Sequence, residues 1–242
     1  FLIDPMLADQ EAYPEVPETT STGRGNPDCD LPCPVESLFD VDAVIVTHLH
    51  FDHFDEVAAK VLPKALTLFS QSEEEAQILR GMGFDDVRVL SGEGIAFDDV
   101  RLYRTKCDHG SSNLVTVDGY KDRGLTEKAS GVVFESAAET ERFYLAGDTI
   151  YCQLVVDAVE KFKPGIVAVN AAGAQYPLGH LIIMNQYDVR SLMRRFPTLK
   201  VIATHVEGVS HATVNRPMLR EFAKANQLDQ LFVPNNGEVL EF

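Results

Sequence analysis

The stretch Thr47-His48-Leu49-His50-Phe51-Asp52-His53 places three histidines and one aspartate within six residues, although the chain has only 7 histidines. It directly follows an apolar run of strand length. Because the side chains of a strand alternate between its two faces, His48 and His50 can point to the same place, and the turn that follows can bring Asp52 and His53 beside them. Imidazole and carboxylate suit zinc and neighbouring divalent metals as ligands. The stretch therefore predicts a metal site at the end of a strand.

Three more candidate ligands, His109, Asp148 and His205, each lie shortly beyond the end of a predicted strand. Taken singly, each has a simpler interpretation: a histidine in a polar loop, an aspartate that caps the following helix, and a histidine at a strand end. A two-metal hydrolytic site needs two ions about 3.5–4 Å apart, with a bridging ligand and a reactive water between them. Together with the first cluster, the three residues complete a ligand set of that kind.

Strands and helices alternate along most of the chain, with pairs of strands between them. This order predicts a layered α/β fold with mixed sheets, in one domain over residues 1–242, because no linker or internal repeat divides the sequence. A buried strand is expected at residues 1–3, and further strands at residues 43–47, 66–70, 87–90, 100–105, 131–135, 142–146, 166–169 and 200–203 and around Leu231 and Val239. Helices are expected at residues 55–62, 72–81, 149–162, 186–196 and 215–225.

Residues Pro5 to Pro34 form a long Pro-rich loop that contains no predicted helix or strand. Loops longer than about 12–15 residues within a compact domain are usually functional or disordered, so we expect either a lid over the site or a disordered segment. Tyr13, Val16 and Leu31 could offer apolar contacts to a substrate, and Arg24 is the only basic residue of the segment.

Composition excludes several classes of function. Of the 242 residues, 21 are basic and 37 acidic, which gives a net charge of −16. Such a charge disfavours binding to nucleic acid or to anionic lipid. No apolar stretch reaches the roughly 18 residues that a membrane-spanning helix needs, and the sequence shows no export signal. With only 4 cysteines, we expect unpaired thiols in a cytoplasmic protein without membrane insertion. The sequence does not indicate an oligomeric state.

The motif His48-x-His50-x-Asp52-His53, followed in order by His109, Asp148 and His205, resembles the metallo-β-lactamase superfamily. The resemblance extends from Leu2 to Glu238. Its details are closest to the branch of the L-ascorbate-6-phosphate lactonase-like and N-acyl-phosphatidylethanolamine phospholipase D-like proteins. It implies a four-layer αβ/βα sandwich of two mixed sheets with metals at one sheet edge. Because the chain opens directly on a strand, the first strands of that fold are expected to be absent from the given sequence.

The resemblance also implies roles for the site residues. One metal would be bound by His48, His50 and His109, the second by Asp52, His53 and His205, and Asp148 would bridge the two. We expect two divalent ions, Zn²⁺ before Mn²⁺ or Fe²⁺, and a metal-activated hydroxide that attacks an ester, lactone, amide or phosphodiester bond of a small-molecule substrate. Asp52 would orient the nucleophile or accept its proton.

Two alternatives keep the same fold. The first is an iron-dependent sulfur dioxygenase, which some relatives in the superfamily are, and the second is a non-catalytic metal-binding or sensor protein. The complete ligand set favours two metals and hydrolysis over both.

Three further residues have open interpretations. His211 is a candidate catalytic residue, as a substrate contact or proton donor, or else an exposed loop histidine. His180 is interpreted as a loop histidine without a role. Asp4 is either an acceptor for the N–H of a metal-binding histidine or a turn residue before Pro5.

Overall fold

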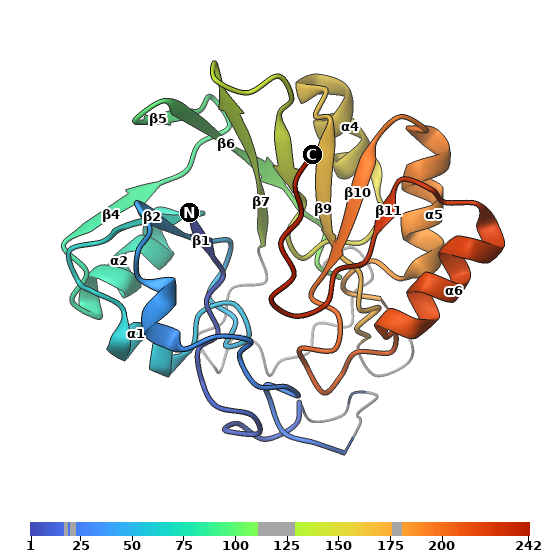
Figure 1. The fold of residues 1–242 in the computed structure, drawn as a ribbon. Helices are drawn as coiled ribbons and strands as arrows, with labels where there is room; N and C mark the ends of the chain where they lie inside the picture. Colours follow the sequence, from blue (N-terminus) through green and yellow to red (C-terminus); the bar gives the residue numbers. More distant parts are fainter. Residues whose placement is uncertain (17–18, 20–22, 111–128, 176–180) are drawn as a thin grey trace.

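A computed structural model describes residues 1–16, 19, 23–110, 129–175 and 181–242 of the chain. Two β-sheets lie face to face, and the helices cover their outer faces (Figure 1). The smaller sheet has the strand order β1-β2-β3-β4 and the larger one β11-β10-β9-β8-β7-β6-β5. This is the expected α/β sandwich, so the fold class is confirmed.

The smaller sheet is wholly parallel among its described strands, and α1 and α2 pack on its outer face. All of β2 is buried because both faces of the sheet are covered. Val44 and Val46 pack towards the helices, and Ala43 and Ile45 pack towards the other sheet. The elements are β1 (Leu2–Ile3), a short 3-10 helix (Val35–Leu38), β2 (Ala43–Val46), α1 (Glu56–Val61), β3 (Thr67–Ser70), α2 (Glu73–Gly81) and β4 (Asp86–Val89).

The larger sheet is mixed. Strands β5 to β8 pair antiparallel, and β8 to β11 pair parallel. Helices α4, α5 and α6 cover its outer face (Figure 1). The elements are β5 (Ile95–Phe97), β6 (Val100–Lys106), β7 (Ser130–Ser136), β8 (Phe143–Leu145), α4 (Gln153–Phe162), β9 (Ile166–Asn170), α5 (Gln186–Arg195), β10 (Lys200–Thr204), α6 (Arg216–Asn226) and β11 (Leu231–Phe232).

Four details differ from the sequence-based expectations. Only the larger sheet is mixed. Strand β5 was not predicted, since its three residues are too few to show a periodic pattern. The strand expected around Val239 is wrong, because this residue is 80% exposed and lies outside the sheet. The first strand was expected to be buried, but β1 lies at the edge of its sheet and is only half-buried.

The sheet order sets the place of the functional residues. Strands β6, β8, β9 and β10 run in the same direction, because β7 lies antiparallel between β6 and β8. Their carboxyl ends therefore meet at one edge of the larger sheet, the usual place for sites in such folds. The end of β2 brings the histidine-rich stretch to that edge from the smaller sheet.

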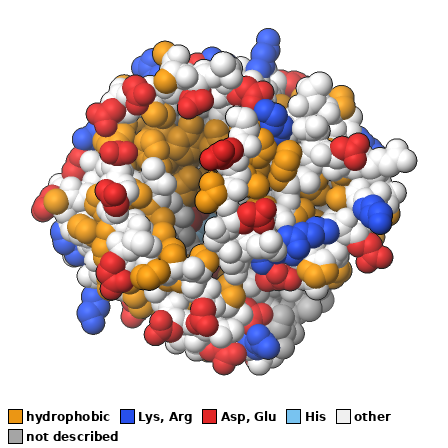
Figure 2. Space-filling model, viewed as in Figure 1, with side chains coloured by type: hydrophobic (Ala, Val, Ile, Leu, Met, Phe, Trp, Pro, Cys, Tyr) orange, Lys and Arg blue, Asp and Glu red, His pale blue; other side chains and the backbone are white. Residues whose placement is uncertain are grey.

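The surface carries charged side chains of both signs. Figure 2 shows them scattered over one face of the molecule, around a hollow that has hydrophobic side chains along its wall. None of the described helices has the length and apolar character needed to cross a bilayer.

Candidate metal centre

The structure brings all seven predicted ligand residues together. His48, His50 and His109 form one group, and Asp52, His53 and His205 form another, with the ligand atoms of each group within 4.8 Å of one another. His48, His53 and Asp148 form a third, overlapping group by the same measure. The two groups that the sequence resemblance implied are therefore present as distinct, adjoining clusters of donor atoms.

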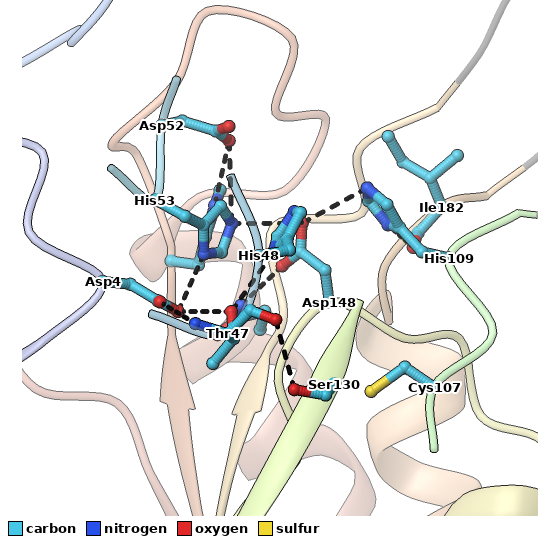
Figure 3. A network of polar contacts seen from close by, with 12 residues as sticks. Asp4, Thr47, His48, Asp52, His53, Cys107, His109, Ser130, Asp148 and Ile182 are labelled. Carbon is cyan, nitrogen blue, oxygen red and sulfur yellow. Dashed lines mark hydrogen bonds and ion pairs between the residues drawn. The ribbon is translucent and has the colours of Figure 1, made fainter. Parts of the chain in front are cut away.

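Asp148 lies between the two groups. Its Oδ2 atom is 3.2 Å from Nε2 of His53, 3.6 Å from Nε2 of His109 and 3.9 Å from Nε2 of His48 (Figure 3). On the other side of His53, Asp52 Oδ2 lies 3.9 Å from Nε2 of His53 and 3.3 Å from Nε2 of His205. Oδ2 of Asp148 thus faces donors of both groups, His53 in one and His48 and His109 in the other.

A tight turn between β2 and α1 carries the first cluster. The backbone N–H groups of His53 and Phe54 both donate to the carbonyl of His50, at 3.0 Å each. Asp55 then caps α1 by accepting from the N–H of Ala58 at 2.7 Å. The turn and cap hold the cluster on a rigid connection between strand and helix. After β10, His205 has a φ of 58°, in the left-handed region that residues other than glycine rarely adopt.

Asp4 determines which ring nitrogen carries a proton in His53 and His48. Its Oδ2 accepts from His53 Nδ1 at 2.8 Å and from the hydroxyl of Thr47 at 2.8 Å. Since the Thr47 proton goes to Asp4, the Thr47 oxygen accepts from Nδ1 of His48, which lies 3.1 Å away. The expectation that Asp4 accepts a histidine N–H is confirmed. Both imidazoles therefore carry a proton on Nδ1 and turn Nε2 towards the cluster, where the neutral ring offers a lone pair.

The third histidine facing Asp148 follows the same rule. His109 donates from Nδ1 to the carbonyl of Ile182 at 2.7 Å, so its Nε2 also faces inward (Figure 3). Among the described residues, the buried Nε2 atom of His48 has no hydrogen-bond partner, and the buried Nε2 atom of His53 faces the carboxylate of Asp148 at 3.2 Å. Buried polar atoms normally have one, so these nitrogen atoms, converging on a carboxylate, fit a divalent cation.

Burial and neighbouring charges set the protonation of the histidines. Burial lowers the pKa of His50 to about 3, and burial together with the charge of His53 holds the pKa of His48 well below its usual value. Burial also acts against the charged form of His53, but the carboxylates of Asp148 and Asp4 outweigh it and hold the pKa of His53 well above the usual value.

The two carboxylates of the cluster are ionised at neutral pH. Burial opposes their charge, but His53 and His205 hold the pKa of Asp52 well below its usual value, and His53 and His109 do the same for the pKa of Asp148. Burial likewise acts against the charged form of His205, and its contacts with Asp52 and Asp148 raise the pKa of His205 despite it. The metal-free cluster is thus a network of opposite charges.

Two other expectations have clear outcomes, and a third concerns a residue that the structure does not describe. His211 is buried, with 7% of its surface exposed, so its interpretation as an exposed loop histidine is wrong. Burial lowers the pKa of His211, and the charges of Asp52 and His205 also act on that pKa, which places the ring near the cluster. Asp148 does not cap a helix, because α4 begins at Gln153 after Cys152. His180 lies outside the described residues.

Sequence reasoning missed two residues that hold the ligands, Thr47 and Asn170. Thr47 relays the effect of Asp4 to His48, as described above. The side-chain amide of Asn170 donates to Oδ1 of Asp148 at 2.6 Å. A signal for Asn170 existed: it is the polar residue that ends the apolar strand β9, at the sheet edge where β8 and β10 deliver their ligands.

The described parts of the Pro5–Pro34 loop are anchored to the segments that carry the cluster. The N–H groups of Leu7 and Ala8 donate to Oδ2 of Asp55, at 3.1 and 2.8 Å. The Tyr13 ring lies edge-on to Phe51, with 5.8 Å between centroids. These parts of the loop therefore have a defined position beside the site. Leu31, a candidate for contact with substrate, packs against the hydrophobic core of the smaller sheet and is half-buried there.

Buried Asn26 connects the loop to the segment between β10 and α6. Its side chain donates to the carbonyl of Pro14 and accepts from the N–H of Ser210, both at 2.8 Å. The N–H of Asp28 donates to the carbonyl of Gly208 at 3.0 Å. The loop is thus fixed to the segment that carries His205 and His211.

Comparisons with known proteins agree with this geometry. A family model described as "Beta-lactamase superfamily domain" matches residues 1–206. The UPF0173 protein YddR of Bacillus subtilis (strain 168) is 38% identical over 245 residues, which cover 100% of this chain and 92% of YddR.

Two solved structures have the same fold over nearly the whole chain. An isothiocyanate hydrolase from Delia radicum gut bacteria has a TM-score of 0.92 and 36% identity, over 99% of this chain and 91% of that one. A possible metal-dependent hydrolase from Veillonella parvula DSM 2008 has a TM-score of 0.87 and 35% identity, over 98% and 90% of the two chains.

Proposed function

The chain belongs to the beta-lactamase superfamily, and from this we propose that its converging side chains hold two divalent metal ions that serve the hydrolysis of a small molecule. The observation that carries the proposal is the position of Asp148 Oδ2, which lies 3.2 Å from Nε2 of His53 and 3.6 Å from Nε2 of His109. These two histidines belong to different donor groups, so a carboxylate between them suits a bridging role.

The proposed assignment follows the two groups of donors. His48, His50 and His109 hold one ion, and Asp52, His53 and His205 hold the other. Imidazole and carboxylate ligands accept Zn²⁺, Mn²⁺ and Fe²⁺, and we propose Zn²⁺ as the first candidate.

Two divalent ions in such a site lower the pKa of water towards neutrality and stabilise negative charge that develops on the substrate. The chain's own residues supply proton acceptance and orientation. Asp52 is ionised, because His53 and His205 hold its pKa well below the usual value despite burial. An ionised carboxylate accepts hydrogen bonds, so Asp52 can orient a water molecule, and we propose that it also takes the proton of that water. His211, buried beside the cluster, is proposed to contact the substrate or donate a proton to the leaving group.

The substrate is proposed to carry an electrophilic carbon or phosphorus centre, as in an ester, lactone, amide or phosphodiester. The 36% identical structural relative is named an isothiocyanate hydrolase, so an isothiocyanate belongs among the candidate substrates. The hydrolase names of the structural relatives favour hydrolysis over sulfur dioxygenation and over a non-catalytic sensor.

The proposal is tested with protein stripped of metal by a chelator, dialysed, and reloaded with Zn²⁺, Mn²⁺ or Fe²⁺. Metal content is measured by mass spectrometry, and turnover is measured with an aryl isothiocyanate, ester, lactone, anilide and phosphodiester. We expect two ions per chain and metal-dependent hydrolysis of at least one of these compounds. Metal content well below one ion per chain would refute the proposal, as would oxygen consumption on a persulfide without any hydrolysis.

A further inference from the structure

Asn170, the last residue of β9, connects the segments after β8 and β10, which carry Asp148 and His205. Its Nδ2 donates to Asp148 Oδ1 at 2.6 Å, and its Oδ1 accepts from the hydroxyl of Thr204 at 2.8 Å. Asn170 and Thr204 are register partners in β9 and β10, and Thr204 directly precedes His205. With only 6% of its surface exposed, Asn170 makes these bonds away from solvent.

The chemistry of its neighbours fixes the orientation of the Asn170 amide. Ionised Asp148 can only accept hydrogen bonds, so the atom 2.6 Å from it must be the amide nitrogen. The amide oxygen then faces Thr204, whose hydroxyl can donate to it. A flipped amide would place two oxygens in contact at Asp148. The chain Thr204–Asn170–Asp148 therefore has a fixed direction, from the Thr204 hydroxyl through the Asn170 amide to Oδ1 of Asp148.

This arrangement leaves Asp148 with two different oxygens. Oδ1 accepts the amide proton of Asn170, whereas Oδ2 faces Nε2 of His53 and His109, at 3.2 and 3.6 Å. A carboxylate can in general join two cations through one oxygen or through both. An amide bonded to Oδ1 prevents the carboxylate from turning and favours contact through Oδ2 alone.

Resting on the proposed function, we infer that Asn170 is a positioning residue that holds Asp148 so that Oδ2 alone joins the two metal sites. Asn170 itself contacts neither group of ligand atoms in the described structure and acts through Asp148. Thr204 supports it by fixing the amide.

The test compares Asn170→Ala and Thr204→Val with the wild-type protein and with Asn226→Ala. Asn226 is a matched control, since its amide also donates a hydrogen bond, to the carbonyl of Phe222 at 2.9 Å, but it lies at the end of α6 away from the cluster. The dissociation constants of both ions are measured by Mn²⁺ titration. The exchange coupling between the two bound Mn²⁺ ions is measured by electron paramagnetic resonance, and unfolding of the metal-free proteins is followed in parallel.

We expect Asn170→Ala to weaken binding of the more weakly held ion about 10–100-fold, the usual cost of losing an outer partner of a ligand, and to change the exchange coupling. Thr204→Val should shift both readouts in the same direction by less, and Asn226→Ala should change neither. If Asn170→Ala does not fold, Thr204→Val decides alone.

Two outcomes are distinguishable. If the wild type binds two coupled ions but both variants keep its dissociation constants and coupling, Asn170 is only a structural residue and the inference is wrong. If the wild type binds no ion pair, the proposed function fails, and the inference fails with it.

Discussion

Asp4 and His53 are 49 positions apart in the chain, yet Oδ2 of Asp4 lies 2.8 Å from Nδ1 of His53. The parallel pairing of β1 with β2 makes this contact possible, because it brings the residue after β1 to the end of β2. Asp4 has a φ of 48°, and through Thr47 the same carboxylate also orients His48. One residue outside both donor groups therefore prepares a histidine in each of them.

We predict that Asp4→Asn weakens metal binding about 10–100-fold, as expected for an outer partner of a metal ligand. Asparagine tolerates the left-handed backbone, so the protein should still fold. The amide, however, has only one acceptor oxygen, so it cannot accept both from the backbone N–H of Thr47 and from His53 as the two carboxylate oxygens do. Isothermal titration with Zn²⁺ measures the effect, and exposed Asp9 provides the matched control as Asp9→Asn. Equal affinities of the two variants would show that Asp4 has no influence on the ligands.

We predict that Asp52→Ala lowers kcat/KM about 10²–10⁴-fold, because it removes a ligand and a proton acceptor together, while the free energy of unfolding changes far less. Asp157→Ala is the control, since that carboxylate lies on the exposed side of α4, where it accepts from Gln153 at 2.7 Å. Similar losses of activity in both variants, at matched folding, would contradict the role of Asp52.

The sequence alone was sufficient to predict the fold class and to group the site residues. The first cluster could be recognised because three histidines and an aspartate follow a single strand. The other ligands could be recognised because β6, β8 and β10 are each followed by one candidate ligand. The outer partners were harder to identify. Asp4 was proposed as an acceptor, but Thr47 and Asn170 act through hydrogen bonds that only the pairing of strands distant in sequence creates.

Strand β5 and the burial of His211 were also missed, because neither produces a pattern in the local sequence. Periodicity indicates buried faces, so it identified β2 and β9 but missed three-residue β5, which pairs with β6 as a short hairpin. The burial of His211 could not be predicted, because tertiary packing and not the local sequence determines it. The adjacent Ser210, for example, donates its N–H to Asn26, which belongs to the Pro5–Pro34 loop and is remote in sequence.

We predict that Asn26→Ala changes the ratio of kcat/KM values across the substrate panel without changing metal content. The variant loses two buried hydrogen bonds, which should also lower the free energy of unfolding by about 1–3 kcal/mol. Gln10→Ala is the control in the same loop, because the Gln10 side chain is exposed. Asn26→Ala is a more specific test than a variant in which a short Gly-Ser link replaces residues 11–28. That replacement would also remove the contact between Asp28 and Gly208. Identical kinetic constants for all substrates would show that the loop does not determine selectivity.

We predict that metal binding near pH 7 releases protons and that affinity rises with pH. In the metal-free protein the carboxylates of Asp148 and Asp4 outweigh burial and hold the pKa of His53 well above its usual value, so His53 is protonated at pH 7. A metal needs the neutral imidazole and must displace that proton. Burial lowers the pKa of His50 to about 3, so His50 is already neutral at pH 7 and releases no proton when a metal binds. Titration calorimetry in two buffers of different ionisation enthalpy counts the protons released. No release would contradict the prediction.

Anomalous diffraction from crystals of the Zn²⁺-loaded protein would locate both proposed ions. We expect two zinc peaks. One should lie about 2.0–2.2 Å from the ligand atoms of His48, His50 and His109, and the other at the same distance from those of Asp52, His53 and His205. Oδ2 of Asp148 should contact both. A single peak, or a second peak away from Asp52 and His205, would contradict a binuclear site.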